Sequence, residues 1–426
     1  MWTPWPLTHP LDVRQALLEK QEIALLDVRP ENLFAQAHPL FAANFPLSQI
    51  ELEVRRRIPR LDTAIVLYDN GEGLAPRAAA TLQQMGYTGV SLLDGGLDGW
   101  RQAGGEIFID VNVPSKAFGE LVASVRHTPS LSAQEVKALL DRQANVVVLD
   151  ARRFDEYQTM SIPTAVSVPG AELVLRAGAL APDPGTLIVV NCAGRTRSIM
   201  GTQSLVNAGI PNPVAALRNG TMGWTLAGQT LEQGAHRRFE GAPRAQGRVA
   251  AQRARAVADR AGVRRAGRVD LAAFASESGR TTYLFDVRTP EEFADGHLPG
   301  FVSAPGGQLV QETDVHAPVR GARVVLADLD GVRANMSASW LAQMGWDTWV
   351  LDTTGVADAA DFVALTCTET LRIDRDARSA PSRNERYRRP YEGADNPHEA
   401  MQAYLDWELG LVDQLARDGT HGFTVL

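Results

Sequence analysis

The sequence is short of cysteine, and this shortage excludes one class of fold. Of 426 residues only two are cysteines, Cys192 and Cys367. Two thiols cannot form the disulfide framework of small secreted proteins, so we expect a reducing compartment, the cytoplasm. Cys367 lies in VALTCTET, without the glycine and arginines found near Cys192. We therefore interpret Cys367 as an inert thiol.

Long hydrophobic runs and an excess of positive charge are missing too. No uncharged apolar stretch approaches the roughly 20 residues that a membrane-spanning helix needs. The start, MWTPWPLTHP, lacks the basic and apolar regions of a signal peptide. A net charge of −8 argues against nucleic acid or an anionic membrane as a partner. With 45% hydrophobic residues, the chain can still bury a real core.

What the sequence does contain is an internal repeat. Three segments combine an apolar run with Asp-x-Arg and an aromatic residue: IALLDVRPENLF (23–34), VVVLDARRFDEY (146–157) and TYLFDVRTPEEF (282–293). A second apolar run follows each of them. The residue after that run lies 42 positions beyond the Asp in every copy: Asp69 after Asp27, Cys192 after Asp150, and Asp328 after Asp286. The position of the cysteine therefore recurs, but the thiol does not.

Apolar strands that alternate with helical stretches predict an α/β fold of tandem units, each a small parallel sheet flanked by helices. The expected boundaries are 1–110, 128–236 and 266–357 for the three units, 237–265 for a helical linker rich in Ala and Arg, and 358–426 for a C-terminal arm and helix. In that last helix, expected over 398–419, Met401, Leu405, Leu409 and Val412 follow helical spacing. We expect this face to pack on a neighbouring domain or on a second subunit.

The residues around Cys192 predict a reactive site. Cys192 follows the apolar run 187–191 and precedes a helix-like stretch. Sites form at the carboxyl ends of parallel strands, and helix N-termini favour anions. We therefore expect the Cys192 thiolate to be stabilised, with help from Arg195 and Arg197, and Gly194 to adopt a positive φ. The alternative, an inert buried cysteine, fits these polar neighbours poorly.

The Asp-x-Arg motif, the NCAGRTRS loop and the glycine-rich turn that ends at Trp224 resemble the rhodanese sulfurtransferase family, in a subgroup with several tandem units. The resemblance implies that Cys192 is the catalytic nucleophile. It would take the outer sulfur of thiosulfate, 3-mercaptopyruvate or a small persulfide, and pass it from a Cys192 persulfide to cyanide, glutathione or a protein thiol. Neither a cofactor nor a metal is implied.

The resemblance also places five loop residues at the substrate: Gly194, Arg195, Thr196, Arg197 and Ser198. The two arginines would hold an anionic donor. Thr196 and Ser198 would donate hydrogen bonds to the sulfur or cap the following helix. Three residues support the site: Asp150, Arg152 and Trp224. An ion pair is favoured for the first two, because all three units share them, and packing is favoured for the tryptophan.

Two rival interpretations differ in chemistry. A cysteine phosphatase needs one more residue between Cys and Arg than Ala193–Thr196 supply, and Ser198 stands where its arginine would be. A non-catalytic sulfur carrier or persulfide-responsive interaction protein would use the same thiol without fast turnover. In the outer units Asp69 and Asp328 cannot form a persulfide, so we expect both units to be inactive. The Asp69 carboxylate is expected to bind the N–H groups of its own loop.

Overall fold

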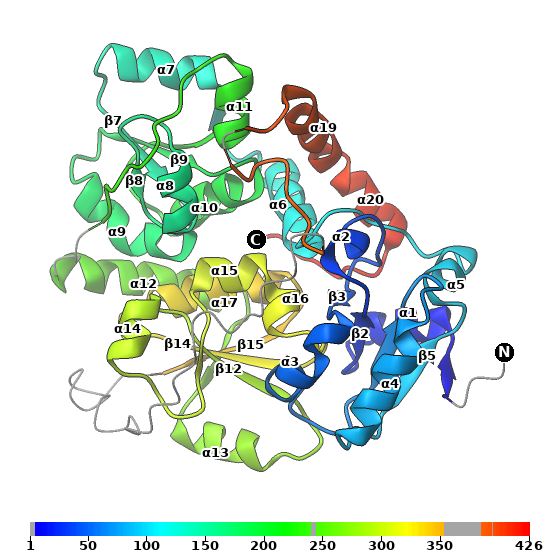
Figure 1. Ribbon diagram of the computed structural model, residues 1–426. Helices are drawn as coiled ribbons and strands as arrows, with labels where there is room; N and C mark the ends of the chain where they lie inside the picture. Colours follow the sequence, from blue (N-terminus) through cyan, green and yellow to red (C-terminus); the bar gives the residue numbers. More distant parts are fainter. Residues whose placement is uncertain (1–4, 240–243, 353–384, 394) are drawn as a thin grey trace.

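The structure, a computed structural model, describes residues 5–239, 244–352, 385–393 and 395–426 (Figure 1). These residues form three five-stranded sheets in which the strands pair in parallel. The strands are β1 Leu7–Thr8, β2 Ala24–Asp27, β3 Ala43–Asn44, β4 Ile65–Tyr68 and β5 Val90–Leu93; β6 Ser130–Leu131, β7 Val146–Asp150, β8 Val166–Ser167, β9 Leu187–Asn191 and β10 Val214–Leu217; β11 Arg264–Ala266, β12 Thr282–Asp286, β13 Val302–Ser303, β14 Arg323–Ala327 and β15 Asp347–Leu351. The predicted fold class is confirmed.

The three sheets share one strand order. It is β1-β5-β4-β2-β3 in the first unit, β6-β10-β9-β7-β8 in the second and β11-β15-β14-β12-β13 in the third. The central strands β4, β9 and β14 are largely apolar and almost fully buried, as parallel strands covered on both faces are. Each central strand ends directly before one of the repeated positions, Asp69, Cys192 or Asp328. The repeat therefore marks the carboxyl edge of each sheet, where sites form.

Helices connect the strands. The first unit has α1 Pro10–Leu18, α2 Glu31–Phe34, α3 Ile50–Arg57, α4 Leu74–Gln84 and α5 Gly96–Gln102; the second has α7 Ala133–Asp141, α8 Phe154–Thr159, the 3-10 turn η2 Gly170–Glu172, α9 Leu173–Leu180, α10 Thr196–Asn207 and α11 Gly220–Leu226. The third has α13 Arg268–Ser276, α14 Pro290–Asp295, α15 Gly306–Gln311, α16 Thr313–His316 and α17 Arg333–Gln343. Between and after the units lie α6 Val113–Arg126, α12 Arg244–Arg260, α19 His398–Leu409 and α20 Leu411–Asp418.

The Asp-x-Arg motif forms the same buried ion pair in each unit. Arg152 binds Asp150 over 2.7 Å and also donates to the Met160 carbonyl over 2.6 Å. The pairs Asp27–Arg29 and Asp286–Arg288 repeat this arrangement. Trp224 is fully buried, and its indole N–H donates to a backbone carbonyl. Asp150 and Arg152 therefore form an ion pair, and Trp224 is a packing residue. The sequence favours the same roles.

Helix α6 joins the three units. Its Phe118 packs edge-on against Trp340 of the third unit and against Phe423 near the C-terminus. The same helix packs along α10 of the second unit. One hydrophobic core consequently runs through the first unit, α6 and the third unit. The units are thus parts of one packed molecule.

The linker contains the helix that the sequence predicts. Helix α12 packs against α9 and α17, and its Ala254, Val257 and Ala258 are fully buried. Strand β11 begins at Arg264, so the third sheet starts two residues before the predicted boundary at 266.

The single C-terminal helix predicted over 398–419 is wrong in one respect. The chain forms two helices, α19 and α20, which break at Gly410. Met401 and Leu405 are buried as predicted, but Leu409 at the break is 59% exposed. Both helices pack on α6, and Figure 1 shows them along that side of the molecule. The predicted arm up to residue 384, with Cys367, lies outside the described residues.

Candidate active site

Cys192 is the first residue after the central strand β9, and α10 begins at Thr196. The start of α11 fixes the turn between them, because the Thr221 N–H donates to the Cys192 carbonyl over 2.9 Å. Gly220 has a φ of +56°, and a Cβ there would lie 2.2 Å from that carbonyl oxygen. Only glycine allows this approach. The glycine-rich turn of the sequence therefore holds the cysteine loop in place.

The Cys192 side chain is 2% exposed and faces a small polar cavity. The volume of this cavity is about 20 Å³, enough for one water-sized group. It is lined by Lys116, Cys192, Ala193, Gly194, Arg195, Thr196, Arg197, Gln311, Tyr391, Tyr404 and Glu408. The thiol is therefore buried among charged and aromatic groups, with room beside it for a single sulfur atom.

The pKa of the Cys192 thiol is raised above its ordinary value, so the expected stabilised thiolate is wrong for the resting protein. Burial is the largest cause. The charge of Arg197 and the hydroxyl and backbone N–H of Ser198 lower this pKa but do not outweigh burial, and Glu408 raises it further. The thiol must therefore lose its proton before it can react.

Both loop arginines bind carboxylates of neighbouring helices. Arg195 donates two hydrogen bonds of 2.7 Å to Glu120 of α6. Arg197 donates to Glu156 of α8 over 2.7 and 2.9 Å. Burial raises the pKa of Glu156, but Arg197 outweighs it and lowers that pKa to about 2, so this pair stays charged. Donor binding by the arginines stays a prediction; the observed contacts hold α6 and α8 against the loop.

Three other loop residues, Gly194, Thr196 and Ser198, make contacts that differ from those expected. Gly194 has no positive φ; a Cβ there would lie 3.1 Å from Glu408 Oε2, so the site needs glycine for space. Neither Thr196 nor Ser198 caps α10, whose N-cap makes no side-chain bond. The Ser198 hydroxyl donates to the Arg195 carbonyl over 2.8 Å, and that of Thr196 donates to Glu408 over 3.4 Å.

Sequence reasoning missed the groups that cover Cys192. Tyr404 and Glu408 come from α19, Tyr391 precedes that helix, and Lys116 comes from α6. One signal was available for Glu408, because it lies one turn after Leu405 on the face that the sequence predicts to be buried. A carboxyl group on a buried helix face needs polar partners, and Thr196 of the cysteine loop supplies one.

A larger cavity of about 620 Å³ adjoins that of Cys192. All three units and the C-terminal segment form its walls, which carry charges of both signs. Arg197, Gln311 and Tyr391 line both cavities. The volume lies within the roughly 300–1,000 Å³ of small-molecule sites.

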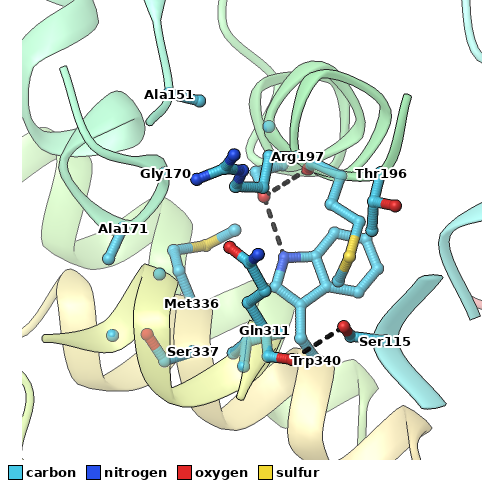
Figure 2. A pocket seen from close by; sticks show the side chains of 16 residues that line it. Ser115, Ala151, Gly170, Ala171, Thr196, Arg197, Gln311, Met336, Ser337 and Trp340 are labelled. Carbon is cyan, nitrogen blue, oxygen red and sulfur yellow. Dashed lines mark hydrogen bonds between the residues drawn. The ribbon is translucent and has the colours of Figure 1, made fainter. Parts of the chain in front are cut away.

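A third cavity, of about 50 Å³, lies between the second and third units and shares Thr196, Arg197 and Gln311 with the Cys192 cavity (Figure 2). The Trp340 indole lies at its centre, and Ser115 donates to the Gln311 carbonyl over 2.8 Å. Its other walls are mostly glycine, alanine, serine and methionine, and Cys192 is not among them. This cavity reflects the packing of two domains.

The aspartates of the outer units turn into their own loops. Asp69 accepts hydrogen bonds from the backbone N–H groups of Gly71, Leu74 and Ala75, over 3.0, 2.6 and 2.9 Å. Asp328 accepts them from Gly331 and Ala334, over 3.0 and 2.8 Å. The prediction for Asp69 is confirmed, and both loops direct backbone N–H groups at the carboxyl that stands in the position of Cys192.

In the second unit the central strand of a parallel sheet ends directly before Cys192, and a helix begins shortly after it. These features define a thiol-bearing α/β domain. The family model described as Rhodanese-like domain matches residues 11–103, 132–227 and 270–355. The chain belongs to the rhodanese-like family, with three such domains, as the sequence predicts.

A solved structure and two curated proteins are among the relatives that resemble the chain. It is 54% identical to the crystal structure of a thiosulfate sulfurtransferase from Pseudomonas aeruginosa, with a TM-score of 0.93 and coverage of 99% of this chain and 100% of that one. It is 41% identical over 83 residues to the uncharacterized protein YqhL of Bacillus subtilis, covering 20% of this chain and 62% of that protein. It is 33% identical over 159 residues to SseB of Mycobacterium tuberculosis, provisionally named a thiosulfate sulfurtransferase, covering 35% and 52%. The matches span less than two thirds of either curated relative.

In the part of the chain that the structure describes, none of the helices combines the length and the apolar character needed to cross a bilayer.

Proposed function

We propose that this protein is a rhodanese-type sulfurtransferase in which Cys192 carries the transferred sulfur as a persulfide. One observation carries this: a lone thiol at the end of β9 and the start of α10 faces a polar cavity sized for one more atom. The likeness to the Pseudomonas aeruginosa enzyme extends over the whole chain, which favours catalytic turnover over passive sulfur carriage.

In the first half-reaction the Cys192 thiolate attacks the outer sulfur of a small anionic donor, thiosulfate or a persulfide. A bond forms between Sγ and that sulfur, and sulfite or a thiolate leaves with the electron pair. The outer persulfide sulfur is negative and needs hydrogen-bond donors. The first-turn N–H groups of α10 supply them, and the Ser198 hydroxyl can turn from the Arg195 carbonyl to join them. Arg197 adds positive charge beside it.

In the second half-reaction a thiophilic acceptor, cyanide or a thiol, attacks the outer sulfur and Cys192 leaves as the thiolate. The closed site favours small acceptors over protein thiols, because Cys192 is 2% exposed. Such molecules fit the adjoining cavity. The domains with Asp69 and Asp328 are inactive in this proposal, and the scarcity of cysteine supports a reducing compartment, the cytoplasm, for the reaction.

Mass spectrometry after incubation with thiosulfate tests this function. Cys192 should gain one sulfur atom and lose it on addition of cyanide, with thiocyanate formed over many turnovers. Cys192→Ser should remain folded and gain nothing at this position. A wild-type protein that stays unmodified with thiosulfate and with small persulfides would contradict the assignment.

A further inference from the structure

The Cys192 cavity is lined by one carboxylic acid, Glu408, and this side chain has no cationic partner among the described residues. The three cations of this cavity each bind another carboxylate: Lys116 binds Asp110, Arg195 binds Glu120, and Arg197 binds Glu156. Within the described ranges, Glu408 takes part in no ion pair, although it is 1% exposed. A buried carboxyl without a cation holds its proton more readily than its neighbours.

One oxygen of Glu408 is free and lies against the cysteine loop. Oε1 accepts hydrogen bonds from the Tyr404 hydroxyl over 3.1 Å and from Thr196 over 3.4 Å. Oε2 has no partner among the described residues. A Cβ on Gly194 would lie 3.1 Å from Oε2, so this oxygen faces the loop beside Cys192. Buried polar atoms are rarely left without a partner, which points to a group that arrives during the reaction.

Groups from several elements face this carboxyl. They are Lys116 and Glu120 of α6, Cys192, Arg195 and Arg197 of the loop and α10, Tyr391 of the C-terminal segment, and Tyr404 of α19. Burial raises the pKa of Glu408 to about 8, Lys116 and Arg195 oppose this, and Glu120 adds to it. The pKa of Cys192 is raised as well, also mainly by burial. Both groups are therefore weaker acids than usual, and they line one cavity, so that a proton held by one can pass to the other.

We propose that Glu408 exchanges the reaction's proton with Cys192, an inference that rests on the proposed sulfur transfer. As Cys192 attacks the outer sulfur of thiosulfate, its proton moves to the Glu408 carboxylate. The bond between Sγ and the outer sulfur forms, and sulfite leaves with the electrons of the broken bond.

In the return step the proton is transferred in the opposite direction, from Glu408 to Cys192. A cyanide ion or thiolate attacks the outer sulfur, the electrons of the disulfane bond return to Sγ, and Glu408 protonates Sγ. One proton thus alternates between the two groups, and no further reactant is needed. While the persulfide is negative, Glu408 is neutral and does not repel it.

Single-turnover sulfite release from thiosulfate tests this assignment. Glu408→Gln keeps the shape of the side chain but cannot accept the proton, so we expect release to slow by about 100-fold or more. The wild-type rate should rise as the pH passes about 8, because only the ionised carboxylate accepts a proton. This step should be absent from Glu408→Gln, whose rate rises only at the higher pH where Cys192 itself ionises, and present, at a reduced rate, in Glu408→Asp. Glu399→Gln, exposed on the same helix, should behave as the wild type.

Two failures are distinguishable in this experiment. If Glu408→Gln releases sulfite at the wild-type rate and with the wild-type pH profile, Glu408 is a packing residue and the proposal is wrong. If Glu408→Gln does not fold, the Asp variant decides, because loss of its pH step also contradicts the proposal. A wild-type protein that never releases sulfite contradicts the sulfurtransferase function itself.

Discussion

Two loops of this chain, one with a carboxylate and one with a thiol, show what keeps a sulfur atom available. After β4 the Asp69 carboxylate fills its loop and binds three backbone N–H groups. After β9 the corresponding amides belong to Gly194, Arg197 and Ser198, counted from Cys192 as the others are from Asp69. The first loop contains its anion permanently. The second has the same donors without a resident anion, so it can receive one.

The comparison extends to the ion pair behind the loop. Arg197 follows Cys192 by as many residues as Arg333 follows Asp328, and each binds a glutamate, Glu156 or Glu292. In the first unit, leucines occupy both matching positions, Leu74 for the arginine and Leu33 for the glutamate. Because both partners are present or absent together, the pair acts as one structural unit.

The largest effect should follow when the thiol loop after β9 is given the carboxylate of the loop after β4. In Cys192→Asp the carboxylate cannot hold a sulfane sulfur, so sulfur transfer to cyanide should fall below detection. The chain should stay folded, because Asp69 shows that such a loop accommodates a carboxylate. Thiocyanate formation and thermal unfolding measure the two expectations. Residual turnover in this variant would mean that another group carries the sulfur.

The second prediction separates the ion pair from the thiol. Arg197→Leu takes from the Glu156 carboxylate its closer cation and leaves it Arg153 at 3.7 Å, so the free energy of unfolding should fall by about 3 kcal/mol. Adding Glu156→Leu should recover most of this loss, because the first unit has leucines at both matching positions. Urea unfolding of both single variants and the double variant measures the coupling. Additive losses would show that the two side chains stabilise the loop independently.

Much of this architecture could be predicted because its signals are local or periodic. Apolar runs gave the strands, and an equal spacing in three copies located Asp69, Cys192 and Asp328 at one sheet edge. The burial of Cys192 could not be predicted, because Lys116 and Glu408 reach its cavity from helices remote in the sequence. The same is true of Gly194, whose missing side chain makes room for α19. The end of α19 at Gly410 and the exposure of Leu409 likewise depend on how α19 and α20 pack on α6.

A third, smaller effect concerns the resident anion of the first loop. Asp69→Ala leaves three backbone N–H groups without their acceptor, that of Ala75 buried, so stability should fall by about 1–3 kcal/mol. Sulfur transfer should be unchanged, because Asp69 lines neither the Cys192 cavity nor the one adjoining it. Urea unfolding and steady-state turnover check both. Asp141→Ala, at a side chain 61% exposed, is the control without a stability effect. A large loss of turnover in Asp69→Ala would show that the outer domain takes part in the reaction.

The smallest change tests a hydroxyl that the thiol loop has and the carboxylate loops lack. Ser198 has alanine at its matching positions, Ala75 and Ala334. Its hydroxyl lowers the pKa of Cys192, so Ser198→Ala should raise that pKa further. Below the pKa a higher value means less thiolate, so alkylation by iodoacetamide at neutral pH should slow by about tenfold. The whole rate profile should move to higher pH, whereas Ser198→Thr, which keeps the hydroxyl, should stay near the wild type. An unmoved profile in Ser198→Ala would assign the effect to the backbone N–H alone.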